Sequence, residues 1–533
     1  MSNKADKIYI YDTTLRDGGQ TSFVDFTLEN KLDLARKLDE LGVDYIEAGW
    51  PGANPTDTGF FADLPELENS EITAFGMTHR FGIKPEEDKG FNNILKSSVK
   101  IVTIVGKSWD FHVTEALKIS LEDNLAIVKS SIAALKNAGK EVFFDAEHFF
   151  DGYKANPEYS IKVIEAAYQA GARWVVMCDT NGGTLPDEIY DIVSKVTKVM
   201  PGDKLGIHCH NDTDNAVANS LAAVRAGVRQ VQGTLNGLGE RCGNANLTSL
   251  LPTLKFKLDY DIAVTAESLN KLKSLANYLC DLLNYPADPY APYVGSAAFA
   301  HKGGLHASAM LKNTASYEHL DPALVGNTRN ILVSNQSGRA SIVSRLEDLG
   351  IEIIEEKLAE LIDRVKQKEA EGFAYDLADA SFALLAMRVF SGKQEFYKLD
   401  SYKVINEKRL NSKGEWVNSS DAILKLEIFN KLVIQVAEGN GPVAALDGAF
   451  RKALASYYPI LEKCRLSDYK VRILNSDAAT SALIRVLVET TDEQGKRWVS
   501  VGVGTDVIDA SYMALDDAIN YLLLFSKNGQ LDG

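Results

Sequence analysis

The sequence predicts an α/β protein, in which a closed (β/α)8 TIM barrel precedes a helical linker region and a C-terminal α+β domain. Two observations predict this order. Eight short β-type runs alternate with amphipathic helical stretches up to about residue 255, and the pattern becomes β-rich from about Ser401. At 533 residues, the chain is also too long for one compact core. We expect the barrel over residues 1–270, the helical linker region over 271–395 and the last domain over 396–533.

The expected strands of the barrel are short runs rich in β-branched and aromatic residues. They are Ile8–Asp12, Tyr45–Gly49, Ile72–Met77, Val99–Val105, Glu141–Asp145, Trp174–Asp179, Lys204–His208 and Gln230–Thr234. Helical patterns such as Leu28–Leu41 and Asn124–Ala138 lie between most of them, and several end at a glycine, which favours a helix stop. The alternative is a doubly wound open sheet. It is disfavoured because no Gly-x-Gly-x-x-Gly turn follows the first run.

Beyond the barrel the sequence pattern changes twice. A predicted helix over Leu269–Leu283 precedes the segment Tyr285–Tyr293, whose prolines exclude a regular helix or a central strand. In the last domain, a strand-like run, a Gly-containing turn and a helical pattern occur twice, beginning at Leu432 and at Trp498. This repetition predicts a pseudo-symmetric domain, with the coincidence of two ordinary β-turn-α units as the alternative.

Composition limits the partners and the compartment. The formal net charge is −16 and the isoelectric point is near 5.1, which argues against nucleic acid or an anionic membrane surface as a partner. No apolar run approaches the length of a membrane span, and the N-terminus shows no signal-peptide pattern. The five cysteines are scattered and odd in number, which is typical of free thiols in a reducing cytosol. We therefore expect a cytoplasmic globular protein.

Polar residues follow the expected strands at their carboxyl ends, where a barrel places its active site. His208 and His210 lie two residues apart at the end of the seventh run, so their side chains point the same way. Alone, such a pair also fits a polar strand end. Together with Asp12, which ends the first run, it predicts two imidazoles and a carboxylate with open coordination positions. That set suits Mn²⁺, Zn²⁺, Co²⁺ or Mg²⁺, and a metal that holds a ketone oxygen acts as a Lewis acid.

Two further strand-end residues each have two interpretations. Arg16 follows the first run, where it could neutralise an enolate or oxyanion, or form an ion pair with Asp17 or Glu47. Thr180 follows the sixth run, where it could donate a hydrogen bond to a substrate carboxylate or cap the next helix. The sequence leaves both choices open. It gives no role to the segment Met77–Arg80, at the end of the third run.

Three separated motifs resemble those of the 2-isopropylmalate, homocitrate and citramalate synthases. They are Asp-Thr-Thr-Leu-Arg-Asp-Gly-Gly-Gln at 12–20, His-x-His at 208–210 and Gly-Glu-Arg-Cys-Gly-Asn-Ala at 239–245. The resemblance covers almost the whole chain. It implies a metal-dependent barrel that condenses acetyl-CoA with a 2-oxo acid, a linker subdomain and a C-terminal feedback-regulatory domain. Within this family, Cys178–Gly183, His301–His306 and Cys242 resemble the citramalate branch, which uses pyruvate on a route to isoleucine.

The resemblance also implies roles for individual residues. It implies that Arg16 contacts the oxo acid and stabilises the developing charge, with Asp17 and Thr180 as further substrate contacts. The metal ligands that it implies, the last of them bound directly or through water, are Asp12, His208, His210 and Asn244.

Three more residues are implied as catalytic groups. Glu147, on the fifth strand, corresponds to a carboxylate beside the substrate, whereas His306 and Tyr317 correspond to a pair that the neighbouring subunit contributes. A base must remove a methyl proton from acetyl-CoA before the enolate attacks pyruvate and the thioester is hydrolysed. His306 and Glu147 are both candidates for this base, since a histidine near neutral pKa also suits the step.

Other members of the fold are the alternatives to a citramalate synthase. The nearest is a 2-isopropylmalate synthase, with a branched oxo acid and leucine as effector, but Gly19 stands where those enzymes commonly carry Glu. A lyase on the same barrel is disfavoured by the β-rich region 401–533, and a non-catalytic binding protein by the complete set of site residues. We expect the last domain to sense isoleucine at the interface of a homodimer or higher homo-oligomer.

Overall fold

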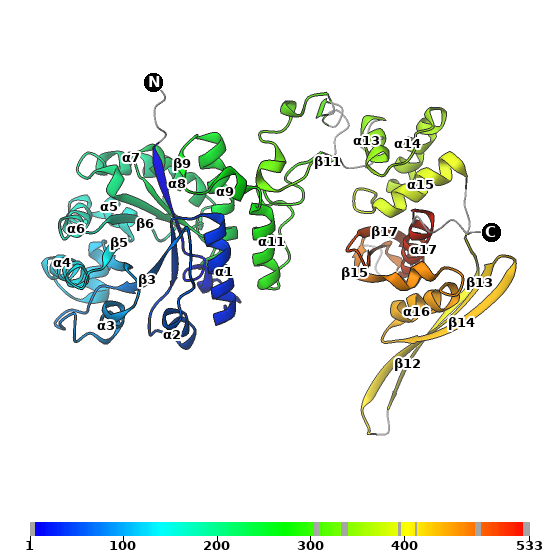
Figure 1. Cartoon of the computed structure of the whole chain (residues 1–533), viewed down its shortest axis with the longest axis horizontal. Helices are drawn as coiled ribbons and strands as arrows, with labels where there is room; N and C mark the ends of the chain where they lie inside the picture. Colours follow the sequence, from blue (N-terminus) through cyan, green and yellow to red (C-terminus); the bar gives the residue numbers. More distant parts are fainter. Residues whose placement is uncertain are drawn as a thin grey trace. The chain divides into compact units, whose positions relative to one another are not determined.

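The computed structural model describes residues 6–301, 306, 309–310, 312–331, 339–392, 396–410, 413–474 and 481–525. The chain forms two compact units. The first consists of Met1–Phe299 with Leu320–Arg329, and the second of Ala300–His319 with Asn330–Gly533 (Figure 1). Among the described residues, no helix combines the length and the apolarity that crossing a membrane requires.

The first unit is a closed parallel barrel, as the sequence predicted. Neighbouring strands pair in the order of the chain, and β1 pairs with both β8 and β2, which closes the ring. A short strand, β9 (Asp261–Ile262), adds to the start of β1. The strands of the ring are β1 (Lys7–Asp12), β2 (Tyr45–Gly49), β3 (Glu71–Met77), β4 (Ile101–Lys107), β5 (Glu141–Glu147), β6 (Trp174–Asp179), β7 (Leu205–Cys209) and β8 (Gln230–Gly233).

Helices surround this ring (Figure 1). The first of them, α1, begins after Thr27 with a capping box and ends at Gly42, whose φ of 89° suits a glycine stop. The helices that follow the strands are α1 (Leu28–Leu41), α2 (Pro55–Ala62), α3 (Lys89–Lys96), α4 (Leu121–Asn137), α5 (Phe149–Ala155), α6 (Pro157–Gln169), α7 (Pro186–Val196) and α8 (Ala216–Arg225). Three more, α9 (Leu247–Pro252), α10 (Ala266–Leu269) and α11 (Leu272–Leu282), follow β8.

Alternate residues of the strands face two different cores. On β1, Ile8 and Ile10 pack in the large core with the helices, whereas Tyr11 belongs to a core built from strand residues alone. Tyr45 of β2 and Phe143 of β5 belong to this inner core as well. Because side chains alternate along a strand, the residues two positions further on also point inward. The inner core fills the barrel, so the space for a site lies at the carboxyl ends of the strands.

The second unit contains the repeat that the sequence indicated. Two antiparallel three-stranded sheets are each followed by a helix, and the helix packs on the sheet that precedes it. The first repeat is β12 (Lys398–Leu410), β13 (Trp416–Ile428), β14 (Lys431–Gly439) and α16 (Pro442–Leu454). The second repeat is β15 (Cys464–Ile473), β16 (Ile484–Asp492), β17 (Arg497–Gly504) and α17 (Val507–Phe525). The short strands β10 (Ala300–His301) and β11 (Asn330–Ile331) and the helices α13 (Arg339–Asp348), α14 (Glu355–Ala370) and α15 (Asp379–Ser391) precede the repeats.

Candidate active site

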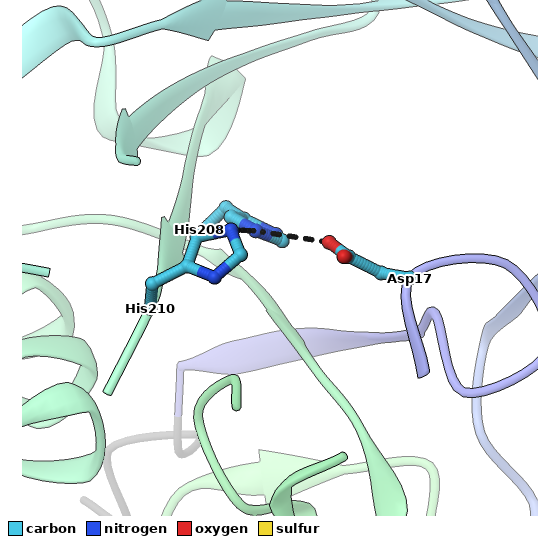
Figure 2. Close-up of side chains that lie close together, drawn as sticks. All are labelled: Asp17, His208 and His210. Atoms are coloured by element: carbon cyan, nitrogen blue, oxygen red, sulfur yellow. Dashed lines mark hydrogen bonds and ion pairs between the residues drawn. The ribbon is translucent and has the colours of Figure 1, made fainter. Parts of the chain in front are cut away.

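Three buried side chains meet at the carboxyl end of the barrel. His208 is the next-to-last residue of β7, His210 directly follows that strand, and Asp17 lies in the loop after β1 (Figure 2). Nε2 of His208 lies 3.4 Å from Oδ2 of Asp17 and 3.4 Å from Nε2 of His210. One potential ligand atom from each residue lies within 4.8 Å of the other two. This is the geometry of a site that can hold one metal ion.

The charges of the three groups fit a divalent cation. Burial lowers the pKa of His208, and burial together with the nearby His208 lowers the pKa of His210 to about 4, so both imidazoles are neutral near pH 7. Burial by itself would raise the pKa of Asp17, but Arg16 and the two histidines outweigh it and lower this pKa. Two neutral imidazoles and an ionised carboxylate are the protonation states in which these side chains bind metals.

A fourth polar group lies beside the three. Asn244 pairs with His210 through an isolated antiparallel bridge, and its Nδ2 donates to the carbonyl of Leu238. Its Oδ1 is buried and has no hydrogen-bond partner among the described residues, and the same holds for Nδ1 of His210. Buried polar atoms without partners are rare, and an amide oxygen is a ligand for hard cations. The donor set therefore fits a divalent metal.

The carboxylate that the structure places with the histidines is Asp17, whereas the sequence had favoured Asp12. Asp12 is fully buried, and its two oxygens accept hydrogen bonds from the backbone N–H and the hydroxyl of Thr14. Burial raises the pKa of Asp12 to about 7. The reason is the alternation of β1: Tyr11 points into the barrel, so the next residue points away from it. The loop then turns back and brings Asp17 over the barrel.

Arg16 is fixed next to this group, and both ion pairs that the sequence had raised are present. Its Nε lies 2.7 Å from Oε2 of Glu47, and its Nη1 lies 3.3 Å from Oδ2 of Asp17. Its guanidinium carbon lies 4.0 Å from the ring centre of Phe75. Glu47 is fully buried and also accepts hydrogen bonds from Tyr11 and Thr13. Arg16 also lines a cavity of about 460 Å³ in the barrel unit.

Thr180 and Glu147 lie on neighbouring strand ends. The hydroxyl oxygen of Thr180 accepts a hydrogen bond from the backbone N–H of His148 at 2.9 Å, which leaves its hydrogen for another acceptor. Thr180 does not cap the next helix, because α7 begins at Pro186 after Leu185. Glu147 forms an ion pair with Lys107 at the end of β4.

His306 and Tyr317 lie in the second unit, and the structure brings them together. Their rings are stacked with centroids 4.1 Å apart and an angle of 28° between the planes. Both side chains are exposed, Tyr317 by 47 %. They therefore form a surface pair.

The chain is similar to known proteins over almost its whole length. Sequence profiles match three consecutive segments: HMGL-like over residues 7–278, homocitrate synthase post-HMGL domain-like over 293–372, and LeuA allosteric (dimerisation) domain over 376–523. Curated relatives include an (R)-citramalate synthase of Aquifex aeolicus, 50% identical over 98% of both chains, and one of Geobacter sulfurreducens, 45% identical over 99% of both. The chain belongs to the (R)-citramalate synthase family.

More distant relatives belong to another class of enzyme, the 2-isopropylmalate synthases. A probable 2-isopropylmalate synthase of Methanopyrus kandleri is 32% identical over 97% of this chain and 98% of its own length. The expectation from the sequence motifs is thus confirmed at the level of the family and of the citramalate branch.

Two residues outside the predicted set of site residues support the site of this family member, one by direct contact with His208 and one through the first. Nδ1 of His208 lies 2.9 Å from Oε1 of Gln232 on β8, and Nε2 of Gln232 donates to Oδ1 of Asp145 on β5 at 3.2 Å. Both residues are almost fully buried. A usable signal existed for Asp145, because it stands two positions after the inward-facing Phe143.

The segment Met77–Arg80, which had no assigned role, has a structural one. Nε2 of His79 lies 2.6 Å from the hydroxyl of Ser130 on α4, and Arg80 forms an ion pair with Asp88, the N-cap of α3. These contacts attach the end of β3 to two neighbouring helices.

Proposed function

We propose that this chain is an (R)-citramalate synthase, which condenses acetyl-CoA with pyruvate and hydrolyses the thioester to give citramalate and CoA. One observation carries the proposal: the buried Asp17, His208 and His210 group lies beside Arg16 in a chain with near full-length similarity to (R)-citramalate synthases. A 2-isopropylmalate synthase is the second candidate, since such enzymes match over most of the chain at 30–32% identity.

The residues at the carboxyl end of the barrel suit this chemistry. A divalent metal (Mn²⁺, Mg²⁺, Zn²⁺ or Co²⁺) held by Asp17, His208 and His210, with Asn244 adjacent, would supply a Lewis acid for the oxo acid. Arg16, held in place by Glu47, stabilises the negative charge that develops on the ketone oxygen when the carbon nucleophile attacks.

The remaining groups orient substrate and move a proton. Thr180 has a hydroxyl hydrogen available for the pyruvate carboxylate, because its oxygen already accepts from His148. Glu147 and His306 are the candidate bases for the acetyl-CoA methyl proton, the latter with Tyr317 stacked on its ring.

We further propose that the second unit forms a homodimer and senses isoleucine, which would place the enzyme in isoleucine biosynthesis. Edge strand β14 supports the dimer, because Leu432, Ile434 and Val436 lie on one face and are 60%, 51% and 52% exposed. Apolar side chains on an exposed edge strand favour association with a second copy. The compartment that we propose is the cytoplasm, in accord with five cysteines that form no disulfide.

A substrate panel tests the proposal. The purified chain, with Mn²⁺ added, is incubated with acetyl-CoA and either pyruvate, a branched 2-oxo acid or no oxo acid, and free CoA is followed with a thiol reagent. We expect CoA release to require an oxo acid and to be fastest with pyruvate, and chiral chromatography to identify (R)-citramalate. A preference for the branched acid would instead identify a 2-isopropylmalate synthase. No oxo-acid-dependent release of CoA would refute both.

A further inference from the structure

A chain of hydrogen bonds crosses the barrel beneath His208. It runs from Nδ1 of His208 on β7 to Gln232 on β8, and from Gln232 to Asp145 on β5, with heavy-atom distances of 2.9 and 3.2 Å. The three residues are 5%, 0% and 4% exposed, so water does not compete for these contacts. The other ring nitrogen of His208, Nε2, faces Asp17 and His210.

The side-chain amide of Gln232 determines which atom donates in each of these two hydrogen bonds, because its oxygen accepts and its nitrogen donates. Oε1 of Gln232 faces the imidazole and can only accept, so Nδ1 of His208 must carry the ring hydrogen. In a neutral imidazole the other nitrogen then has the lone pair. Asp145 keeps the amide in this orientation, because its oxygen accepts from Nε2 of Gln232. A flipped amide would place a donor against Nδ1 and would move the ring hydrogen to Nε2.

We infer that Gln232, oriented by Asp145, is the positioning residue that fixes the tautomer and the ring orientation of His208, so that Nε2 is the nitrogen presented to Asp17 and His210. The inference rests on the proposed metal site. Neither residue touches the substrate in this scheme. Each acts through His208, as the partners of metal-binding histidines do in other sites.

The same strand provides a matched control. Gln230 stands two residues before Gln232 on β8, so the two side chains point to the same side of the strand, and it is also fully buried. Both amide atoms of Gln230 lack a hydrogen-bond partner among the described residues. Replacing either glutamine by methionine removes a similar amide, but only one of them is bonded to a candidate ligand.

Two measurements on the full-length protein test the inference. Long-range ¹H–¹⁵N NMR of histidine-labelled, metal-free protein, with His208 assigned by its substitution, reads which ring nitrogen carries the hydrogen. We expect it on Nδ1 in the unchanged protein and in Gln232→Glu, whose carboxylate also accepts. Mn²⁺ affinity is read from the EPR signal of the free ion. We expect Gln232→Met to weaken binding by about 10- to 100-fold and Gln230→Met to leave it unchanged.

The outcomes separate this inference from the proposed function. A hydrogen on Nε2 of His208 in the unchanged protein overturns the inference, and so does a Gln232→Met variant that binds Mn²⁺ as tightly as the Gln230→Met control. If Gln232→Met does not fold, the NMR result on the unchanged protein still shows whether the inferred tautomer of His208 is correct. If the unchanged protein itself fails to bind Mn²⁺, the metal site of the proposed function fails, and this inference fails with it.

Discussion

At the carboxyl end of the barrel, charged side chains are buried, whereas on the outer face of β14, apolar side chains are exposed. Both placements are the reverse of the usual one. In the barrel, Glu47 is fully buried and Asp17 is 3% exposed, although each forms an ion pair with Arg16. On β14, the apolar residues Leu432 and Ile434 are at least half exposed. Burying a charge and exposing an apolar side chain both reduce stability unless something compensates. In the function that we propose, the two regions therefore meet different partners: ions and small molecules at the barrel, and a second protein surface at the sheet.

At the barrel, the groups that compensate for the buried charges lie in the same unit. At the sheet, we expect a second copy of the chain to cover the apolar face. Each buried charge at the barrel has partners within the same unit, as the bonds of Glu47 to Tyr11, Thr13 and Arg16 show. Such networks cluster at functional sites. Among the described residues of its own repeat, the face of β14 has no comparable cover, since α16 packs against the other side of the sheet, on Leu424 and Ala437.

The largest effect is expected from Asp17, because it is the charged member of the proposed ligand set. Asp17→Ala should abolish measurable Mn²⁺ binding and lower kcat for CoA release by at least about 10³-fold. Asp12→Asn is the matched control: it alters a neighbouring buried carboxylate that bonds only to Thr14 in the contacts described, and its amide oxygen can still accept. It should keep Mn²⁺ binding. Loss of binding in Asp12→Asn but not in Asp17→Ala would restore the ligand that the sequence favoured.

A smaller effect is expected at the sheet. Ile434→Lys places a charge in the middle of the exposed apolar face of β14, and desolvating that charge in an interface is costly. Light scattering after gel filtration should therefore report a mass near that of one chain, about half that of the unchanged protein, and the inhibition by isoleucine that we propose should weaken.

A second lysine variant makes this result interpretable. Val199 is 52% exposed, like Val436, but it lies in the barrel unit. Val199→Lys should leave the mass and the inhibition unchanged. If both lysine variants dissociate the protein, general destabilisation explains the result and β14 is not the interface.

Some of this architecture could be predicted from the sequence because the signals are local. The strands over Tyr45–Gly49 and Trp174–Asp179 have the expected bounds, since buried parallel strands appear as short apolar runs between helices. The two repeats of the second unit could be predicted for the same reason: each carries its turn and helix pattern within its own segment.

The parts that could not be predicted depend on tertiary contacts. To choose Asp17 over Asp12 as the ligand, one must know which way the side chains of β1 point and how the loop after β1 folds. In that loop, the N–H groups of Arg16, Asp17 and Gly18 all donate to the carbonyl of Thr13. The contact of Gln232 with Asp145 joins strands that lie 87 residues apart. A single sequence shows no trace of such pairs, because only the closed barrel brings β5 and β8 to face each other.

The smallest effect is expected from pH, at Asp145. Burial, together with the nearby Glu47, raises the pKa of Asp145 to about 8, whereas the same group in the unfolded chain ionises near pH ~4. Between these values the native state holds a proton that the unfolded state has lost, so the free energy of unfolding falls as pH rises and levels off above about pH 8. Asp145→Asn removes this titration while its amide oxygen can still accept from Gln232.

Urea unfolding of both proteins at about pH 5 and about pH 8 measures the difference. The stability of Asp145→Asn relative to the unchanged protein should increase from the lower to the higher pH, because only the unchanged protein is penalised for the buried carboxyl. Asp33→Asn, which removes an exposed carboxylate on α1, controls for the change in net charge. An Asp145→Asn difference that does not vary with pH, or that equals the Asp33→Asn difference, would show that Asp145 is ionised in the folded barrel. Gln232 would then bond to a full negative charge, which would strengthen the hold of Asp145 on the amide that orients His208.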